Sequence, residues 1–221
     1  YKNLKENFQK ILLIMLPVTP HLANECLEKL EYNKKFFWPE VEEKFLKKES
    51  NNIVIWSILH QKNKHVITSS IEHPAVLKVL DELTAFGLTY DILPVDSTGL
   101  INPTDLRPAI KKDTGLISIM YVNNEVGTVQ KIDKLAEIAK ENSIPFHSDC
   151  VQSIGKIPIS TKKTEVDYMS FSAHKFYGPK GIGFLYKKKG LPLKPLIIGG
   201  GQESNIRAGT ENLSGIAGLG V

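Results

Sequence analysis

The chain has 221 residues, enough for one or two domains, and its 42% hydrophobic content is that of an ordinary globular protein. Its net charge of +4 comes almost wholly from lysine, with arginine only at Arg107 and Arg207, and so weak and dispersed an excess gives no ground to expect nucleic-acid binding. Two cysteines make neither a disulfide framework nor a metal set, so we expect a cytoplasmic protein, and the longest apolar run is too short to span a membrane.

Residues 1–48 are predicted to form a helical segment. Pro17 to Pro20 interrupt a first helical pattern, and Thr19 and Pro20 are suited to cap and begin a second helix. The run L-P-V-T-P-H-L-A-N-E-C-L-E-K-L, followed by W-P-E-V at 38–41, resembles the anticodon-binding helical bundle of leucyl-tRNA synthetases. For His21 and Trp38 we favour simple packing over RNA contact.

From about residue 50 the pattern changes to alternating strands and helices. Strands are predicted at 65–69, 90–95, 115–122, 144–148, 166–171 and 181–186, and helices at 74–86, 103–111 and 132–142. The run at 115–122 is almost continuously apolar, as expected of a strand that is buried on both faces. This alternation predicts an α/β fold with a mostly parallel sheet covered by helices, in which ligands gather at the carboxyl ends of the strands.

Polar side chains follow four of these predicted strands, where each strand ends. They are His73; Asn123, Asn124 and Glu125; Asp149 and Gln152; and Ser172, His174 and Lys175. Because the carboxyl ends of parallel strands meet at one edge of the sheet, we expect these groups to converge on one site.

The chemistry of this set fits pyridoxal 5'-phosphate. Lys175, in a loop between two strands, offers an amine for the cofactor aldehyde, and Asp149 offers an acidic partner for the ring nitrogen. Ser172 and His174 could bind the phosphate, and His73 could lie over the ring and move protons. Taken singly, each has a plainer interpretation: a surface lysine, a turn or cap aspartate, a helix-entry histidine before Pro74, and a turn-forming Asn124. Taken together, they favour a cofactor site.

Five motifs in this part of the chain resemble those of cysteine desulfurases. They are E-H-P-A-V (72–76), V-N-N-E-V-G (122–127), H-S-D-C-V-Q (147–152), S-F-S-A-H-K-F-Y-G-P-K-G-I-G (170–183) and G-G-G-Q-E-S-N-I-R-A-G-T-E-N (199–212). These enzymes belong to the class V aminotransferase group with pyridoxal phosphate fold type I. The resemblance covers residues 49–221 and implies a partial three-layer large domain.

The resemblance also implies roles for individual residues. Lys175 would bond covalently to the cofactor, His73 would stack on the ring, and Asp149 would face the ring nitrogen. Asn124 and Gln152 would lie near the ring hydroxyl, Ser172 and His174 would hold the phosphate, and Thr210 would reach the phosphate bound by the other subunit of a homodimer. The family converts L-cysteine to L-alanine and passes a persulfide sulfur to an acceptor or scaffold protein for iron–sulfur clusters or tRNA thiolation.

Four departures limit what the resemblance implies. In the family, the catalytic cysteine, the arginine for the substrate carboxylate and the small domain lie beyond the position of Val221, and neither Cys26 nor Cys150 matches that cysteine. Leu46, Lys47 and Lys48 replace the Gly-Ala-Thr of the family's phosphate loop.

We therefore expect a fragment that is inactive alone and a chimeric junction near residue 49. A related class V enzyme such as selenocysteine lyase, and a tRNA-binding module at residues 1–48, remain as alternatives.

Overall fold

The computed structural model describes residues 49–220; the predicted helical segment at 1–48 lies outside the described residues. The strands are β1 (His65–Ser69), β2 (Thr89–Leu93), β3 (Thr114–Ser118), β4 (Phe146–Asp149), β5 (Tyr168–Ser172) and β6 (Gly183–Lys187). The helices are α3 (Glu49–Ile58), α4 (Pro74–Leu83), α5 (Pro103–Ala109), α6 (Ile132–Glu141), α7 (Gln202–Asn205) and α8 (Leu213–Leu219), with short 3-10 helices at Thr84–Phe86 (η1) and Ala173–Phe176 (η2).

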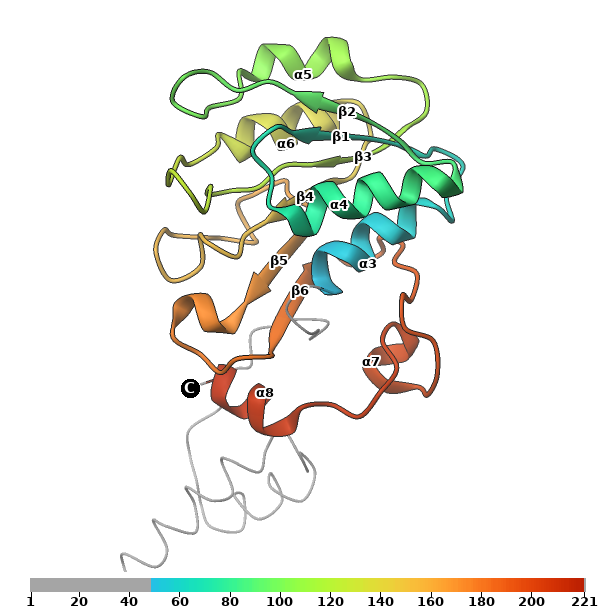
Figure 1. Ribbon diagram of the computed structural model, residues 1–221, viewed down its shortest axis with the longest axis vertical. Coiled ribbons are helices and arrows are strands. Elements are labelled where there is room, and N and C mark those ends of the chain that lie inside the picture. The colour runs from blue at the N-terminus through green and yellow to red at the C-terminus, as the bar shows by residue number, and fades with distance from the viewer. Residues whose placement is uncertain (1–48, 221) are drawn as a thin grey trace, which may run out of the picture.

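The strands form a six-stranded sheet in the order β2-β1-β3-β4-β5-β6 (Figure 1). The pairs from β2 to β5 are parallel, and only β6 runs antiparallel, against β5. The connection from β5 to β6 spans only residues 173–182, which is too short for the crossover that a parallel pair requires.

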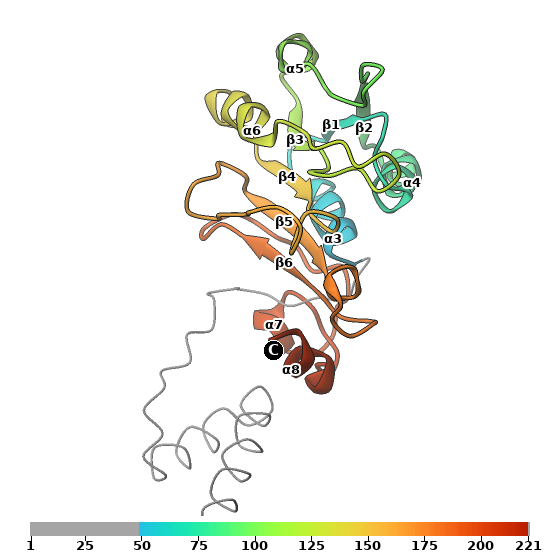
Figure 2. The same ribbon diagram turned by 90° about the vertical axis from the view of Figure 1, so that its left-hand side faces the viewer.

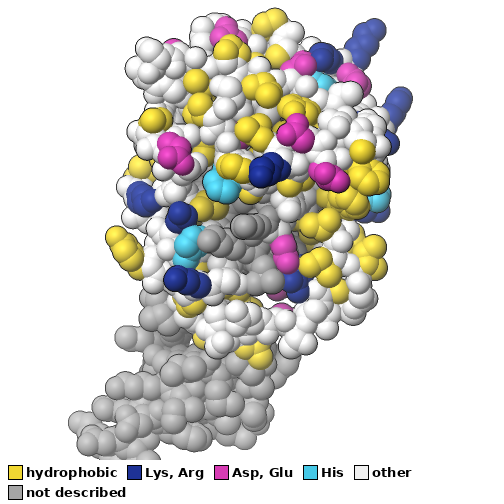
Figure 3. Space-filling model, viewed as in Figure 1, with side chains coloured by type: hydrophobic (Ala, Val, Ile, Leu, Met, Phe, Trp, Pro, Cys, Tyr) yellow, Lys and Arg dark blue, Asp and Glu magenta, His cyan; other side chains and the backbone are white. Residues whose placement is uncertain are grey.

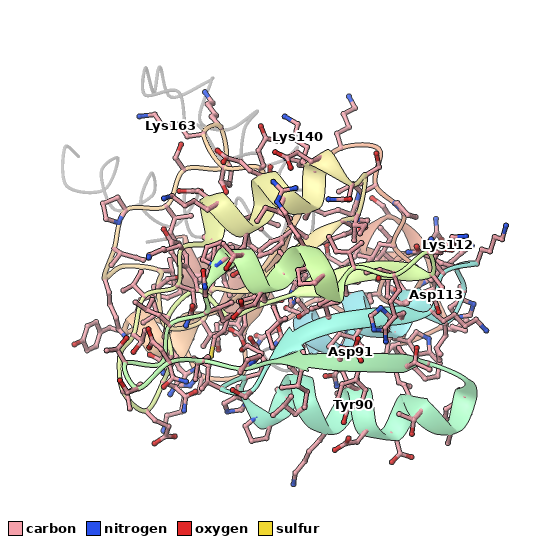
Figure 4. All side chains as sticks on the ribbon, turned by 90° about the horizontal axis from the view of Figure 1, so that it is seen from above. Tyr90, Asp91, Lys112, Asp113, Lys140 and Lys163 are labelled. Carbon is pink, nitrogen blue, oxygen red and sulfur yellow. The ribbon has the colours of Figure 1, made fainter. Side chains whose placement is uncertain are left out.

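Helices cover both faces of the sheet and give a three-layer arrangement. Helices α3 and α4 lie on one face, and α5 and α6 lie on the other (Figures 2 and 4). Successive residues of a strand point to opposite faces, so Val66 and Leu116 pack in the core under α3 and α4, whereas Ile67 and Ile117 pack under α5 and α6.

The predicted elements match the observed ones within a few residues, with two differences. Regular β3 ends at Ser118 rather than at residue 122, although the backbone N–H groups of Ile119 and Tyr121 still donate to carbonyls of β4 and so continue the pairing. Lys175, predicted in a loop, lies in the short helix η2.

Polar contacts near the amino-terminal ends of the strands connect β1, β2 and the entry to β3. Buried His65 lies 3.3 Å from Asp91 and hydrogen-bonds Thr114, and Lys111 pairs with the same aspartate at 2.7 Å. Figure 4 labels Asp91 on β2 and Asp113 just before β3. Because this cluster lies at the strand starts, the opposite edge of the sheet is left for a ligand site.

Candidate cofactor site

A cavity of about 250 Å³ opens at the carboxyl ends of β1, β3, β4 and β5. Its volume is just below the range of roughly 300–1,000 Å³ that is usual for small-molecule pockets. Ten residues line it: Asn51, His73, Ala75, Met120, Val122, Asn124, Asp149, Val151, Gln152 and Lys175. Five of the eight predicted site residues therefore meet at one cavity. Figure 3 shows histidine and lysine or arginine side chains side by side at this edge of the molecule.

His73 reaches the cavity from the turn between β1 and α4. Its Nδ1 accepts the backbone N–H of Ala75 at 3.0 Å, so the imidazole caps α4, and Pro74 occupies the first turn of that helix. His73 is therefore a helix-entry residue that also lines the cavity. With Nδ1 occupied as an acceptor, the hydrogen of the neutral ring lies on Nε2.

Asp149 ends β4 and is 6% exposed. Its Oδ1 accepts the backbone N–H of Val151 at 3.0 Å, and its Oδ2 accepts the side-chain N–H of Asn51 at 2.7 Å. Burial raises the pKa of Asp149, and these two hydrogen bonds act in the opposite direction. Both donors are neutral, so a positively charged partner facing this carboxylate would stabilise its ionised form.

Lys175 lies in η2, directly after β5, and its side chain is exposed. The backbone N–H of Gly178 closes the following turn on the carbonyl of Ala173 at 2.9 Å, and a Cβ at Gly178 would come within 2.9 Å of the Ala173 side chain. Glycine is therefore required at this turn, and Tyr177 before it adopts a left-handed φ of 67°. This compact turn fixes the lysine next to the cavity.

Of the remaining predicted residues, two line the cavity and three do not. Asn124 and Gln152 line it, with Asn124 donating to Glu125 at 2.7 Å and Gln152 accepting from Lys156 at 2.6 Å. Ser172 and His174 are not part of the lining; the Ser172 hydroxyl and His174 Nδ1 lie 2.8 Å apart, beside Lys175 in sequence. Thr210 is exposed in the segment before α8 and also lies outside the lining.

Two acidic or amide residues near the site were not identified from the sequence as part of it. Asn51 lines the cavity from the first turn of α3, and Glu72 is buried in the turn before His73. Glu72 Oε1 accepts the hydroxyl of Ser69 at 2.6 Å and the backbone N–H of Met120 at 2.7 Å. Burial raises the pKa of Glu72 to about 8, so it is mostly a neutral acid at pH 7. Glu72 lies in the motif E-H-P-A-V, and Asn51 lies in the run E-S-N-N at 49–52, directly after the replaced Gly-Ala-Thr; these were the available signals.

Cys150 follows Asp149 but faces the core. It is fully buried, and burial raises the pKa of its thiol to about 12. A thiol in this state is a poor nucleophile. Within residues 49–220, no group of three or more His, Cys, Asp or Glu side chains is arranged to hold a metal ion, and no helix is long and apolar enough to cross a membrane.

Comparison with known proteins gives the following matches. The family described as aminotransferase class-V matches residues 48–221. The cysteine desulfurase IscS of Dictyoglomus turgidum is 53% identical over 175 residues, which are 78% of this chain and 44% of that protein. The chain therefore spans less than half the length of this curated relative.

Two solved structures are similar to this chain in both sequence and fold. A chain from "SspA in complex with cysteine" is 42% identical, with a TM-score of 0.78 over 81% of this chain and 54% of that one. A NifS-like protein is 38% identical, with a TM-score of 0.79 over 97% of this chain and 57% of that one. The predicted α/β class, with a mostly parallel sheet covered by helices, is confirmed.

Proposed function

Because the chain belongs to the aminotransferase class-V family, we propose that it carries the pyridoxal phosphate-binding part of a cysteine desulfurase. The main support is the convergence of Lys175, Asp149 and His73 on one cavity. These residues come from three separate strand ends, and a lysine, a buried carboxylate and an imidazole are the groups that this cofactor needs.

The residues present fit the cofactor. When bound, pyridoxal phosphate supplies an aldehyde for an amine and an electron-withdrawing ring. Lys175 would supply the amine. Asp149, buried and held by two neutral donors, would face the protonated ring nitrogen and would be stabilised in its ionised form by that positive charge.

The phosphate would be held next to Lys175. Ser172 and His174 lie within hydrogen-bond distance of one another, and a hydroxyl and a ring N–H are suitable phosphate donors. Thr210 is exposed and lies outside the cavity of its own chain, which is compatible with a role at the phosphate of a partner subunit in a homodimer. Asn124 and Gln152 at the cavity wall would contact the ring hydroxyl.

The whole enzyme would take L-cysteine, release L-alanine and pass the sulfur as a persulfide to an acceptor or scaffold protein in the cytoplasm. The names of the relatives, and the complex of the similar protein SspA with cysteine, support this substrate. His73 would stack on the ring and move protons through Nε2, because its Nδ1 is engaged by the Ala75 N–H. Its contact with α4 would keep the imidazole plane fixed during that transfer.

The origin of residues 1–48 is a separate proposal. The motif T-P-H-L-A-N-E and the later W-P support descent from a leucyl-tRNA synthetase, and the class-V match begins at residue 48. Amplification across codons 48 and 49 from source DNA tests this chimeric junction. A continuous natural product of the expected length would contradict it.

Cofactor binding is tested with the full chain and its Lys175→Ala variant. Adding pyridoxal phosphate should produce an absorbance band near the boundary of the visible and ultraviolet ranges in the parent chain and not in the variant. Lys180→Ala, an exposed lysine on the same segment, is the matched control and should keep the band. Borohydride reduction followed by peptide mass spectrometry should place the cofactor mass on Lys175. A folded parent chain without the band, or a label on another lysine, would contradict the proposal.

A further inference from the structure

Asn51 connects the first turn of α3 to the end of β4. Its side chain is 3% exposed, and its Nδ2 donates to Asp149 Oδ2 at 2.7 Å. The other carboxylate oxygen, Oδ1, accepts the backbone N–H of Val151 at 3.0 Å. With one donor on each oxygen, the plane of the Asp149 carboxylate is fixed, and rotation about its side chain would break one of these hydrogen bonds.

The same amide has a feature that packing alone does not explain. Asn51 Oδ1 is buried and has no hydrogen-bond partner among the described residues. An unpaired buried polar atom is unfavourable, and an apolar side chain of similar volume would avoid it. The fold therefore keeps a polar side chain at this position in spite of that penalty, and the N–H contact with Asp149 is what the polar group provides.

The Asn51–Asp149 pair also lies at the wall of the candidate cofactor cavity. Asn51 and Asp149 both line the cavity that His73 and Lys175 border. We propose that Asn51 is a positioning residue: its N–H holds the Asp149 carboxylate in the orientation in which that group receives the protonated ring nitrogen of the cofactor. This inference rests on the proposed function, in which Asp149 faces that nitrogen.

Loss of this N–H would act on Asp149 in two ways. The carboxylate would keep only the Val151 donor and could turn away from the cavity. It would also lose one of the two hydrogen bonds that oppose the effect of burial on its pKa, so that more of it would be neutral. A neutral or rotated acid holds a ring N–H⁺ poorly, whereas the phosphate contacts and the lysine would be unaffected.

The test measures cofactor affinity in Asn51→Leu, which has a similar volume and no N–H. Asn52→Leu is the matched control, because Asn52 also has an unpartnered amide oxygen in the first turn of α3 and does not line the cavity. Titrations use pyridoxal phosphate and its deaza analogue, in which C–H replaces the ring nitrogen. Loss of one hydrogen bond to a charged group is expected to weaken ligand affinity roughly ten- to hundredfold.

We expect Asn51→Leu to lose about ten- to hundredfold in affinity for pyridoxal phosphate and little for the deaza analogue, with Asn52→Leu unchanged for both. An equal loss for the two ligands would show a structural role and overturn the inference, as would unchanged affinity for both. If Asn51→Leu does not fold, the smaller Asn51→Ala, which also lacks a donor, is titrated in the same way, with the same outcomes deciding.

The two levels of proposal fail differently. A Lys175-dependent absorbance band in the parent chain, together with wild-type affinities in Asn51→Leu, would overturn only the positioning role. Absence of that band in the folded parent chain would overturn the proposed function and this inference with it.

Discussion

Replacing Glu72 by glutamine should make the stability of the protein less dependent on pH above about pH 5. The Glu72 side chain is buried, and one of its oxygens accepts from both Ser69 and Met120 while the other has no partner among the described residues. Burial is the main reason that its pKa rises from an ordinary 4.5 to about 8. The folded protein therefore binds a proton that the unfolded chain releases across this interval.

The sign of the effect follows from this linkage. A group with a raised folded pKa contributes stability that is fully present below about pH 4.5 and is lost as pH rises through about 8. Each pH unit crossed between the two values costs about 1.4 kcal/mol, so the loss amounts to roughly 3 kcal/mol by pH 7. Glutamine keeps the acceptor oxygen for both donors but places an unpaired N–H where the second oxygen was, which costs about 1–3 kcal/mol at every pH.

The assay is urea unfolding of the full chain at several values between about pH 5 and about pH 8. Across this range the unfolding free energy of the parent chain should fall by roughly 3–4 kcal/mol relative to that of Glu72→Gln. The variant should therefore be less stable than the parent at the acidic end, and as stable as the parent or more stable at the basic end. Glu82→Gln, on the exposed side of α4, should track the parent. Parallel profiles for Glu72→Gln and the parent would refute the view that Glu72 is a neutral acid at pH 7.

Three further substitutions test other contacts, each by the same unfolding measurement. His147→Phe should cost roughly 2–4 kcal/mol at pH 7, because the buried imidazole bridges two serine hydroxyls at 2.8 and 3.0 Å and phenylalanine leaves both unpaired; a loss under about 1 kcal/mol would contradict this. Arg207→Lys should lower the unfolding free energy by about 1 kcal/mol when Glu49 is present and by little in a Glu49→Gln background. The reason is that two N–H groups of the planar Arg207 guanidinium donate to the two Glu49 carboxylate oxygens at 3.1 Å, and a lysine amine cannot reproduce this pair. Gly115→Ala should cost about 1–3 kcal/mol or more, because a Cβ there would lie 2.3 Å from the carbonyl oxygen of Asn63; unchanged stability would mean that this loop moves freely.

The part of the site that follows strands could be predicted from the sequence. His73, Asn124, Asp149 and Lys175 each come after an apolar run, and parallel strands bring their carboxyl ends to one edge whatever the detailed packing. The strand pattern therefore carried information about three-dimensional proximity. It did not fix the direction of β6, although the short link from β5 was a usable signal for an antiparallel pair.

The part of the site that depends on packing across the sheet could not be predicted in this way. The contact from Asn51 to Asp149 joins residues 98 positions apart, and it depends on where α3 lies on the sheet, which no local pattern specifies. Glu72 precedes an exposed histidine in a turn and by its residue type is expected at the surface. In the folded protein its carboxyl group accepts the N–H of Met120, in the segment after β3, at 2.7 Å.

Two buried titrating groups act in opposite directions on the stability of this fold. Burial lowers the pKa of His147 from 6.5 to about 3, so its contribution is complete above about pH 6.5 and is lost as pH falls toward 3. Glu72 loses its contribution upward from about 4.5 to about 8, and the raised pKa of Asp149 acts in the same direction as that of Glu72. Between about pH 4.5 and 6.5 the slopes from His147 and Glu72 are of similar size and opposite sign, so they largely cancel. The decline in stability above about pH 6.5 therefore arises from Glu72, which directly precedes His73 of the cavity wall. Because a bound ring N–H⁺ would favour the ionised form of Asp149, saturation with pyridoxal phosphate should reduce the loss of stability that Asp149 contributes as pH rises. The contribution of His147 should stay unchanged.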